Sequence, residues 1–589
     1  MDNVVDAPSV LQTTTTPVAN AQNRTRSARS AVLIFAVILL AVLTLHLPLV
    51  SLPYVWDEAG YYIPAARDLL VSGHLIPHST TSNAHPPLVI GWLALFWKLA
   101  GFRPVVSRVA MLLIAAFTLL GVFRLAALLS NPQIAIASTV CTGLYPVFFA
   151  QSSLAHLDMA AAGLTLWGVA AYIERRQWST LAWFSLAGLA KETAIVTPLA
   201  ISLWELARPA RRSSANDEAR LEQRPAFLAA ALVPLGAWFA YHYMQTGYVF
   251  GNPEFFHYNV IATLRPGRVV LAAAMRVWQM VGYMHLWLLT LAGALAMFLP
   301  PQRAGCLERP RIAPELQALL LVLVLAYVLT MATIGGAVLA RYMLPVLPLV
   351  IILWVSTLWR RAEHWLPVIV LIGTSFIVGW FVNPPYGFPF EDNLAYRDYI
   401  VLHRTAEQFL AKQRPGARVL TAWPASDELT RPYLGYVSAP LRVVQVDDFS
   451  FEQMVSASDA SAPVDLALVF STKYQPAHPI LNAWQGWDRI KRRYFGYHQD
   501  LLPAVAAEVL HGNVIYSAAR NGQWIGIIEI QPIMDAGELN LPLKGAADDR
   551  SAFSRSAIRL CQDTSQVSRE QLASTAPAFV RRSRLRPVQ

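Results

Sequence analysis

Eight charged or titratable residues lie at or near one end of the apolar segments of this chain: Asp57, Glu58, His85, Arg108, Asp158, Lys191, Glu192 and Arg341. A charged side chain costs about 3 kcal/mol at the centre of a bilayer, so charges that persist near membrane depth usually pair with each other or serve a function. Their shared position predicts one polar site at one end of a helical membrane region.

The adjacent carboxylates Asp57 and Glu58 stand in the segment YVWDEAGYY, directly after the first apolar run. Such a pair suits a general base backed by a second acid that orients a substrate or an ion. The structural alternative is a helix N-cap, in which Asp57 caps a helix over 59–72 and the helix dipole favours Glu58. The two interpretations are compatible, and both stay open.

Asp158 and the pair Lys191-Glu192 belong to two further apolar segments, SSLAHLDMAAAGL and LAGLAKETAIVTP. Asp158 is interpreted either as a substrate-binding or catalytic carboxylate or as an N-cap of the helix that follows it. Lys191 either binds an anion or is neutralised by Glu192 beside it.

Arg341, in GGAVLARYMLPVLP, either binds an anion or extends toward the membrane interface, as long cationic side chains do. Lys191 and Arg341 lie about 150 residues apart near the same interface, and one shared anion would explain both. Tyr342 joins the candidate substrate-binding residues as the neighbour of Arg341, and His85, in NAHPPL, is either a substrate contact or a polar loop residue.

The composition predicts a membrane protein. Hydrophobic residues make up 55% of the 589 residues and charged residues 14%, against about 25% charged residues in a typical soluble domain. Three separate cysteines, Cys141, Cys306 and Cys561, provide neither a disulfide framework nor a CxxC metal site. The net charge of +10 is concentrated in short loops, where it indicates orientation in the membrane rather than binding to nucleic acid.

We expect a mainly α, polytopic membrane protein with about eleven transmembrane helices. The predicted spans are 31–50, 105–129, 134–150, 159–173, 179–190, 194–206, 226–244, 283–299, 316–334, 344–358 and 365–382. Residues 1–30 are expected to be disordered and cytoplasmic, because Arg24, Arg26 and Arg29 precede the first span. A long first outer loop, 51–104, contains a short interfacial helix at 86–101. The loops assigned to the cytoplasm carry more Lys and Arg than the outer loops.

The C-terminal sequence reads as a small extracytoplasmic α/β domain over 386–575, followed by a basic disordered tail at 576–589. Residues 394–413 have helical periodicity, and 418–423, 442–449 and 465–472 read as strands. Asn521-Gly522 between two apolar runs predicts a β-hairpin.

Five motifs in order, WDEAGYY, HPPL, the Asp158 segment, LAGLAKE and RYMLPVLP, resemble the GT-C glycosyltransferases of the protein O-mannosyltransferase and aminoarabinose lipid A transferase type, the glycosyltransferase family 39 and its relatives. The resemblance covers roughly residues 30–385. It implies a GT-C-like catalytic domain over 31–385 that transfers a sugar from a polyprenyl-phosphate carrier to a hydroxyl of a lipid, glycan or protein at the outer face of the cell (inner) membrane, with inversion.

The resemblance also implies roles for individual residues. Asp57 would accept the proton of the acceptor, Glu58 would assist or position it, and Asp158 would hold the acceptor or the sugar. Lys191 and Arg341 would neutralise the carrier phosphate. A divalent metal ion is admitted as a cofactor with no ligands assigned. The chain lacks the long hydrophilic insert of eukaryotic protein O-mannosyltransferases, which argues against a protein acceptor of that particular type.

Two other classes of protein stay open. A transporter or flippase of lipid-linked sugars would use the buried charges as a relay, and inverted repeats would favour it; the sequence has none that we recognise. A membrane-anchored binding or sensor protein would act through residues 400–589, which leaves the clustered charges of the outer loops without a role.

Overall fold

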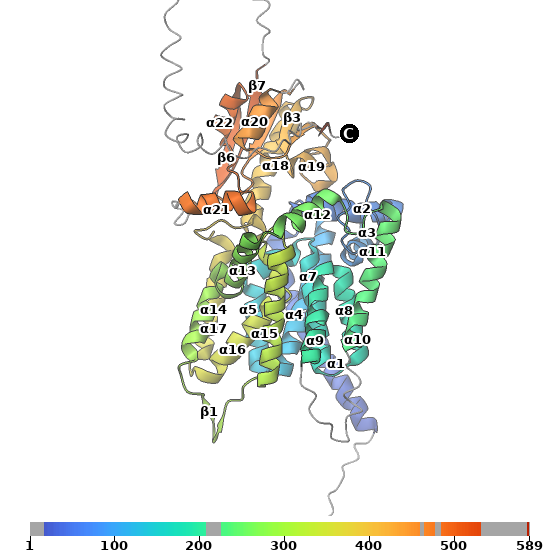
Figure 1. Cartoon of the computed structure of the whole chain (residues 1–589), viewed down its shortest axis with the longest axis vertical. Coiled ribbons are helices and arrows are strands. Elements are labelled where there is room, and N and C mark those ends of the chain that lie inside the picture. Colours follow the sequence, from blue (N-terminus) through green and yellow to red (C-terminus); the bar gives the residue numbers. More distant parts are fainter. Residues whose placement is uncertain (1–16, 208–224, 460–463, 477–484, 532–585, 588–589) are drawn as a thin grey trace, which may run out of the picture.

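The computed structural model describes residues 17–207, 225–459, 464–476, 485–531 and 586–587. In this part of the chain, long helices form a bundle and an α/β region stands on one end of it (Figure 1). The N-terminal end of α1 and the β1–β2 hairpin (Arg303–Ala304 and Leu307–Glu308) lie at the opposite end of the bundle.

The helices of the bundle are joined mostly by short turns. Several begin with proline at the first helical position, where the missing N–H group costs no hydrogen bond. The helices are α1 (Pro17–His46), α4 (Pro104–Leu129), α5 (Pro132–Leu144), α6 (Pro146–Ser153), α7 (Leu157–Ile173), α8 (Gln177–Ala190), α9 (Val196–Ala207), α10 (Pro225–Ala229), α11 (Val233–Thr246), α13 (Pro266–Val281), α14 (Leu286–Ala296), α15 (Pro314–Ile334), α16 (Leu347–Arg361) and α17 (Trp365–Phe381).

Among the described residues, five helical segments are long and apolar enough to cross a membrane: Arg29–Leu49, Pro104–Leu129, Pro225–Thr246, Pro266–Ala296 and Pro314–Ile334. The bent pair α5 and α6, at 69° to each other, makes a sixth if it is one span. Each of the eleven predicted spans contains a helix, but several of these helices are shorter than the ~20 residues that cross a bilayer. The count of eleven therefore stays a prediction.

One predicted span differs clearly from the observed helix. The segment 283–299 was expected to cross alone, whereas the candidate span that contains α14 runs from Pro266 to Ala296 and includes α13, with a kink at Met284 and His285, which have positive φ. The sequence conceals α13 because Arg268, Arg276 and Gln279 lower its hydropathy. These three side chains are buried.

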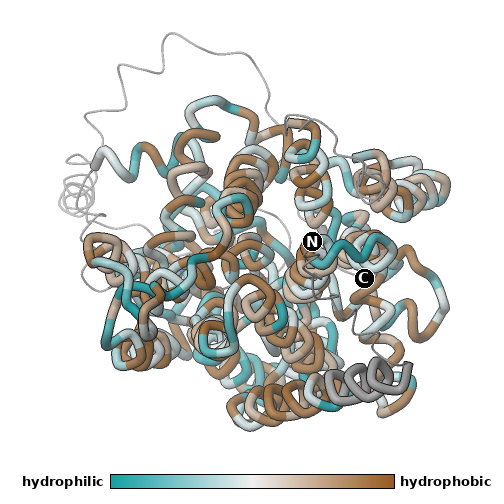
Figure 2. Tube along the Cα trace, turned by 90° about the horizontal axis from the view of Figure 1, so that it is seen from below, coloured by the Kyte–Doolittle hydropathy of each residue, from teal (hydrophilic) through white to brown (hydrophobic). Residues whose placement is uncertain are grey.

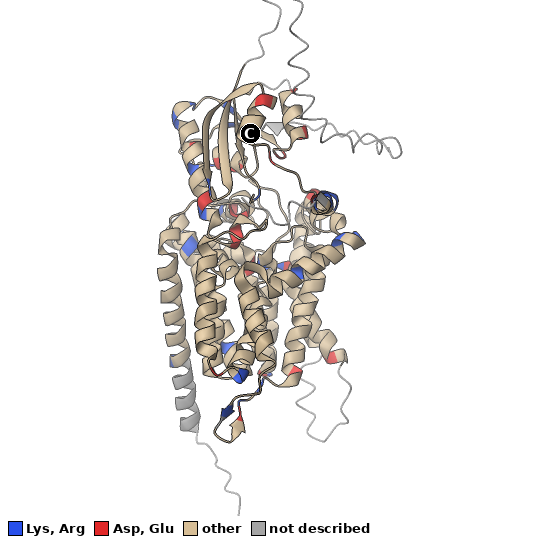
Figure 3. Cartoon of the chain, turned by 90° about the vertical axis from the view of Figure 1, so that its left-hand side faces the viewer, with Lys and Arg blue, Asp and Glu red and all other residues tan. Residues whose placement is uncertain are grey.

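The outward surface of the bundle is apolar. Leu321, Leu325 and Leu329 lie one turn apart on α15 and are each more than half exposed. Hydrophobic residues predominate along the helices (Figure 2), and charges gather at the ends of the bundle and in the C-terminal region (Figure 3). Exposed apolar faces of this extent mark contact with lipid, so the chain is an integral membrane protein.

Short elements cover the end of the bundle that faces the C-terminal region (Figure 1). They include a π-helical turn η2 (Glu58–Tyr62), α2 (Ile63–Ser72), α3 (Leu88–Ala100) and α12 (Pro253–Asn259). The helix expected at 86–101 is α3, with 13 residues. Three 3-10 turns, η3 (Glu192–Ile195), η8 (Ala340–Met343) and η9 (Phe390–Asp392), lie between longer helices.

The C-terminal region contains a sheet in the order β6-β7-β5-β3-β4-β8. Its strands are β3 (Arg418–Ala422), β4 (Arg442–Val446), β5 (Leu466–Phe470), β6 (Gly512–Arg520), β7 (Gln523–Ile530) and β8 (Arg586–Pro587), and its helices are α18 (Ala395–Gln413), α19 (Ala425–Thr430), α20 (Phe451–Ser458), α21 (Gln485–Phe495) and α22 (Pro503–Val509). Strands β3, β4 and β5 are parallel, and β6 and β7 form the hairpin around Asn521-Gly522. The helix at 394–413 and the strands expected from the sequence thus have counterparts.

The two terminal segments differ from expectation where they are described. Helix α1 begins at Pro17, inside the segment expected to be disordered, because the polar residues before the first span continue its helix. Residues 1–16 and most of the expected tail at 576–589 lie outside the described residues. Within that tail, Arg586–Pro587 pairs antiparallel with β4.

Candidate active site

Arg341 is the centre of a buried group of charges. It lies in η8, directly before α16, and is 2% exposed. Its guanidinium contacts the carboxylates of Asp57 and Glu391, and its Nε lies 3.6 Å from Asp158 Oδ2. These partners come from the start of η2, from η9 and from the first turn of α7. The Arg341 side chain is therefore buried among carboxylates and does not extend toward the membrane interface.

Lys191 shares one of these carboxylates with Arg341. Its Nζ donates to Asp158 Oδ1 at 2.6 Å and lies 4.1 Å from the centre of the Tyr342 ring. The anion between Lys191 and Arg341 is thus the Asp158 carboxylate in this structure. Glu192 forms its ion pair with His85 rather than with Lys191, with 3.1 Å between Glu192 Oε2 and His85 Nδ1.

Asp57 is the most accessible carboxylate in contact with Arg341, with 27% of its side chain exposed. It occupies the N-cap position of η2 but makes no capping hydrogen bond with its side chain. Asp158 likewise lies inside the first turn of α7 rather than at its cap, which is His156. Both carboxylates are directed to cations instead of to backbone N–H groups.

Glu58, next to Asp57, is fully buried and pairs with Arg108 of α4. Its carboxylate also accepts hydrogen bonds from the N–H groups of Val55 (3.1 Å) and Ala155 (2.5 Å). Arg108 completes the network by donating to the Pro53 and Ser153 carbonyls at 2.9 and 3.0 Å. This network joins the segment before η2 to α4 and to the turn before α7, so Glu58 fixes the backbone that carries Asp57.

Two acidic residues of η9, Glu391 and Asp392, were absent from the sequence-based site. Glu391 contacts Arg341, and Asp392 accepts a hydrogen bond from the Tyr283 hydroxyl at 2.6 Å. Burial raises the pKa of Glu391 to about 8, reinforced by Asp57 and opposed by Arg341. Burial likewise raises the pKa of Asp392 to about 7. The available signal was an acidic pair after the last apolar run, which parallels Asp57-Glu58 after the first.

Two arginines of α13 also belong to this region: the sequence suggested Arg268 only as a reserve candidate for the phosphate site and did not indicate Arg276. Arg268 is 5% exposed and Arg276 is fully buried, yet neither forms an ion pair with a carboxylate among the described residues. Arg268 contacts the Gly336 carbonyl, Arg276 donates to the Leu339 carbonyl (2.6 Å), and each keeps one guanidinium nitrogen without a partner. The guanidinium carbon of Arg276 lies 5.5 Å from the Tyr342 ring, so Tyr342 stands among Lys191, Arg276 and Arg341.

A small cleft lies beside this group of charges. Tyr61, Tyr62, His85, Trp238 and the segment 80–84 line it, and its volume is about 30 Å³. A cavity of this size holds a water molecule or two but not a sugar. Among the described residues, the group whose side-chain atoms converge as metal ligands do lies elsewhere, in the C-terminal region (His403, Glu407 and Glu428).

Comparison with known proteins agrees with this architecture. The family model for dolichyl-phosphate-mannose-protein mannosyltransferase matches residues 84–238, which contain His85, Asp158, Lys191 and Glu192. A search of curated proteins finds none that matches the chain.

Solved structures align with the chain at low sequence identity, and one of them reaches a TM-score of 0.50. ArnT from Cupriavidus metallidurans in the apo state aligns with a TM-score of 0.50 and 15% identity over 85% of this chain and 98% of that one. The same protein bound to undecaprenyl phosphate gives a TM-score of 0.49 and 14% identity, over 84% and 97% of the two chains. AglB from Archaeoglobus fulgidus, in complex with an inhibitory peptide and a dolichol-phosphate, gives 0.43 and 10%, over 88% and 75%. The family match and the shared fold confirm the resemblance that the motifs predict: this chain is similar to the GT-C membrane glycosyltransferases.

Proposed function

We propose that this protein transfers a sugar from a polyprenyl-phosphate donor to a hydroxyl group of a lipid, glycan or protein acceptor, with inversion at the anomeric carbon. The observation that carries the proposal is the partly exposed Asp57 carboxylate, held by Arg341 at one end of an apolar bundle. Lys191 Nζ and the guanidinium carbon of Arg276 lie 4.1 and 5.5 Å from the centre of the neighbouring Tyr342 ring. A carboxylate base beside clustered cations is the arrangement that transfer from a phosphate leaving group requires.

The charge balance supports an anionic ligand. Lys191, Arg276 and Arg341 face the carboxyl groups of Asp57, Asp158, Glu391 and Asp392. Burial raises the pKa of both Glu391 and Asp392. Each proton that one of these two carboxyl groups takes up leaves positive charge on the three cations that a phosphate could balance.

In this mechanism Asp57 removes the proton of the acceptor hydroxyl as the oxygen attacks the anomeric carbon. The carrier phosphate leaves from the opposite face, which inverts the configuration. Arg276 binds that phosphate with nitrogens that no protein carboxylate occupies among the described residues, and Arg341 and Lys191 add charge beside it. Asp158 holds the two cations and hydrogen-bonds a sugar or acceptor hydroxyl, and Glu58 keeps the backbone of Asp57 in place.

Substrate entry requires a change in the outer segments. The cleft of about 30 Å³ is bounded by the segment 80–85, which is covered in turn by residues 248–256: Asn252 N–H donates to the Ser82 carbonyl at 2.9 Å, and the His85 ring contacts Phe255. We infer that donor binding separates these two segments.

The test is a comparison of lipid-linked sugars and cell-envelope glycans in a deletion strain complemented with the wild-type protein or with Asp57→Asn. We expect one glycan or glycoprotein to lose one sugar in the deletion strain and in the Asp57→Asn strain, while the sugar-loaded polyprenyl phosphate accumulates. Wild-type complementation should reverse both effects. Unchanged profiles in the deletion strain, or full activity of Asp57→Asn, would contradict the proposal. Movement of the donor lipid across the membrane without sugar transfer would favour the flippase alternative.

A further inference from the structure

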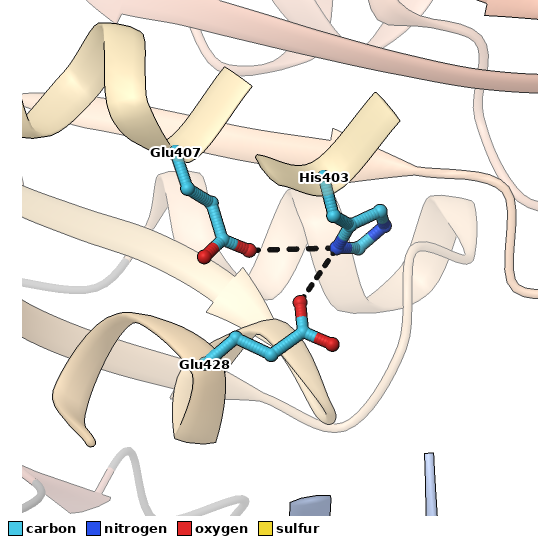
Figure 4. Close-up of side chains that lie close together, drawn as sticks. All are labelled: His403, Glu407 and Glu428. Carbon is cyan, nitrogen blue, oxygen red and sulfur yellow. Dashed lines mark hydrogen bonds and ion pairs between the residues drawn. The ribbon is translucent and has the colours of Figure 1, made fainter. Parts of the chain in front are cut away.

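Three buried side chains of the C-terminal region converge on one point. His403 and Glu407 lie one turn apart on α18, and Glu428 projects from α19 (Figure 4). His403 Nδ1 is 2.7 Å from Glu428 Oε2 and 3.5 Å from Glu407 Oε1. The three ligand atoms all lie within 4.8 Å of one another.

Apart from the His403 ring, no cationic side chain forms an ion pair with either glutamate among the described residues. Glu407 and Glu428 are fully buried, and His403 is 2% exposed. Neither oxygen of Glu407 accepts a hydrogen bond within the described chain, and neither does Oε1 of Glu428. Two buried carboxylates without a cation are costly unless they bind a proton or a metal ion.

We propose that His403, Glu407 and Glu428 bind one divalent transition-metal ion of the Zn²⁺ type. An imidazole and carboxylates are ligands that Zn²⁺ accepts, at about 2.0–2.2 Å from the ion. Two such ligands at tetrahedral angles lie ~3.3 Å apart, and the two observed N–O distances fall on either side of this value. A pair of ligands at positions i and i+4 of one helix is a recurrent arrangement in zinc sites.

The surroundings favour a closed site with a structural role. The His403 ring stacks on Tyr399, with 3.8 Å between ring centres, and contacts the edge of Phe470, so its orientation is fixed as metal-binding histidines require. The buried Tyr436 hydroxyl also has no hydrogen-bond partner among the described residues.

The ion would connect α18 and α19 close to the loop that carries Asp57. Tyr399, which stacks on His403, also contacts Trp56, with 5.5 Å between the ring centres. Trp56 immediately precedes Asp57. A metal ion here would therefore stabilise the contact between the C-terminal region and the first loop. This role is independent of which sugar donor and acceptor the protein uses.

Metal content of the full-length protein tests the proposal. The protein is purified in detergent, freed of any affinity tag, incubated with ZnCl₂ and desalted, and zinc per chain is measured by mass spectrometry. We expect about one ion per wild-type chain. The double variant H403Q/E407Q should bind zinc with at least ~tenfold lower affinity and should therefore lose the ion on desalting. Even residues that only support a ligand typically contribute about 10- to 100-fold to metal affinity. H511N, which changes an exposed histidine of the same region, is the matched control and should keep the ion.

A second measurement distinguishes a metal ion from a shared proton and depends on no variant that fails to fold. If a metal occupies the site, a chelator lowers the Tm of the wild-type protein and added Zn²⁺ restores it, while E407Q responds to neither. If the two carboxylates share a proton instead, neither the chelator nor Zn²⁺ changes the Tm of the wild-type protein, and E407Q has the same Tm as the wild-type protein. The proposal would be overturned by a wild-type Tm that responds to neither reagent. It would also be overturned if the wild-type protein contained no zinc, or if all the variants contained equal amounts of zinc.

Discussion

Asp158 contacts two cations from separate segments, Lys191 and Arg341. This contact weakens the ability of either cation to bind a phosphate on its own. A phosphate that approached them would compete with a carboxylate already in place. Arg276 differs because its partners among the described residues are neutral oxygens. The phosphate site therefore depends on the three cations around Tyr342 jointly, and the contribution of each can be separated by substitution.

The first prediction concerns Asp57. Asp57→Asn keeps the size of the side chain but removes the proton acceptor, so we expect sugar transfer to fall by at least ~100-fold, the usual contribution of general base catalysis. The protein should still accumulate in the membrane. Transfer is measured with purified protein and a polyprenyl-phosphate sugar. Asp459→Asn, at an exposed helix end, is the control and should keep full activity; near-normal transfer by Asp57→Asn would reduce Asp57 to a structural residue.

The second prediction concerns the cations. Arg341 donates to carboxylates in a forked geometry that Lys cannot reproduce, so Arg341→Lys should weaken donor use although the charge is kept. Lys191→Met should weaken it more than Lys191→Arg. A charge-assisted hydrogen bond contributes about 1.5–3 kcal/mol, which predicts an increase in donor KM of roughly ten- to a hundredfold. Titration of the donor lipid measures this. If neutral variants at both positions keep the wild-type donor KM, the phosphate is bound by Arg268 and Arg276 instead.

The third prediction concerns pH. Glu391 and Asp392 have folded-state pKa values raised to about 8 and about 7, so the folded protein holds protons that the unfolded chain releases at lower pH. Their favourable contribution to stability is present below about pH 4 and is lost as the pH rises through 7 and 8. Ionisation also adds negative charge beside the phosphate site. We therefore expect donor KM to rise and Tm to fall between pH 6 and 9.

Glu391→Gln is the comparison for this pH dependence. It removes one titrating group while preserving the shape of the side chain, so both pH profiles should be flatter than in the wild-type protein. The phosphodiester of the donor does not titrate in this range, which leaves the protein groups as the cause. A wild-type donor KM that stays constant from pH 6 to 9 would exclude this role for η9.

At the scale of elements, close packing of α7 against α4 sets the position of Asp158. A Cβ atom at Gly163 of α7 would lie 2.3 Å from Thr118 Oγ1 and 3.3 Å from the Thr118 Cα. Two helices that approach so closely need glycine at the contact, as small residues generally allow in membrane bundles. The position of one active-site carboxylate thus depends on a residue five positions further along its helix.

The fourth prediction follows from this contact. Gly163→Ala should destabilise the protein by about 1–3 kcal/mol, the usual cost of overpacking, and should lower transfer through displacement of Asp158. Gly236→Ala is the matched control, because a Cβ atom there meets nothing within 4 Å and alanine favours a helix interior. Thermal unfolding in detergent measures both variants. Equal melting temperatures would show that α7 and α4 separate without cost.

At the scale of the whole molecule, the charged group, the C-terminal region and the short outer elements lie at one end of the bundle (Figures 1 and 3). The N-terminal end of α1 and the basic β1–β2 hairpin lie at the other end. Because basic loops remain in the cytoplasm, we infer that the candidate active site faces the outside. This arrangement would place the sugar transfer on the extracytoplasmic side.

The fifth prediction tests this orientation. A reporter that is active only outside the cytoplasm should be active when fused after about residue 385 and inactive when inserted in the turn at Gly305 of the β1–β2 hairpin. A reporter active only in the cytoplasm should give the reverse pattern. The paired positions control for expression, since both fusions retain the first half of the bundle. Cytoplasmic activity at residue 385 would overturn the proposed topology and the side on which transfer occurs.

Features that depend on local patterns can be predicted from the amino-acid sequence. Long apolar runs specify membrane helices because the bilayer requires internally bonded backbone, and alternating apolar residues with Asn521-Gly522 specify the β6–β7 hairpin. The cost of isolated charge near apolar segments selected Asp57, Asp158, Lys191 and Arg341 before any contact was known. Hydropathy failed at α13, where inward-facing arginines reduce the mean.

The partners of these charges depend on contacts between segments that are distant in the chain. Asp57 and Arg341 lie 284 residues apart in the chain, and no periodicity encodes such a contact. Sequence proximity left open whether Glu192 neutralises Lys191. In the structure the backbone at Lys191 is extended, the Lys191 side chain contacts Asp158, and Glu192 pairs with His85. The sequence likewise did not predict Glu391 or the glutamates around His403 as site residues. An acidic residue becomes part of a site only when folding removes it from water and brings a partner within a few ångströms.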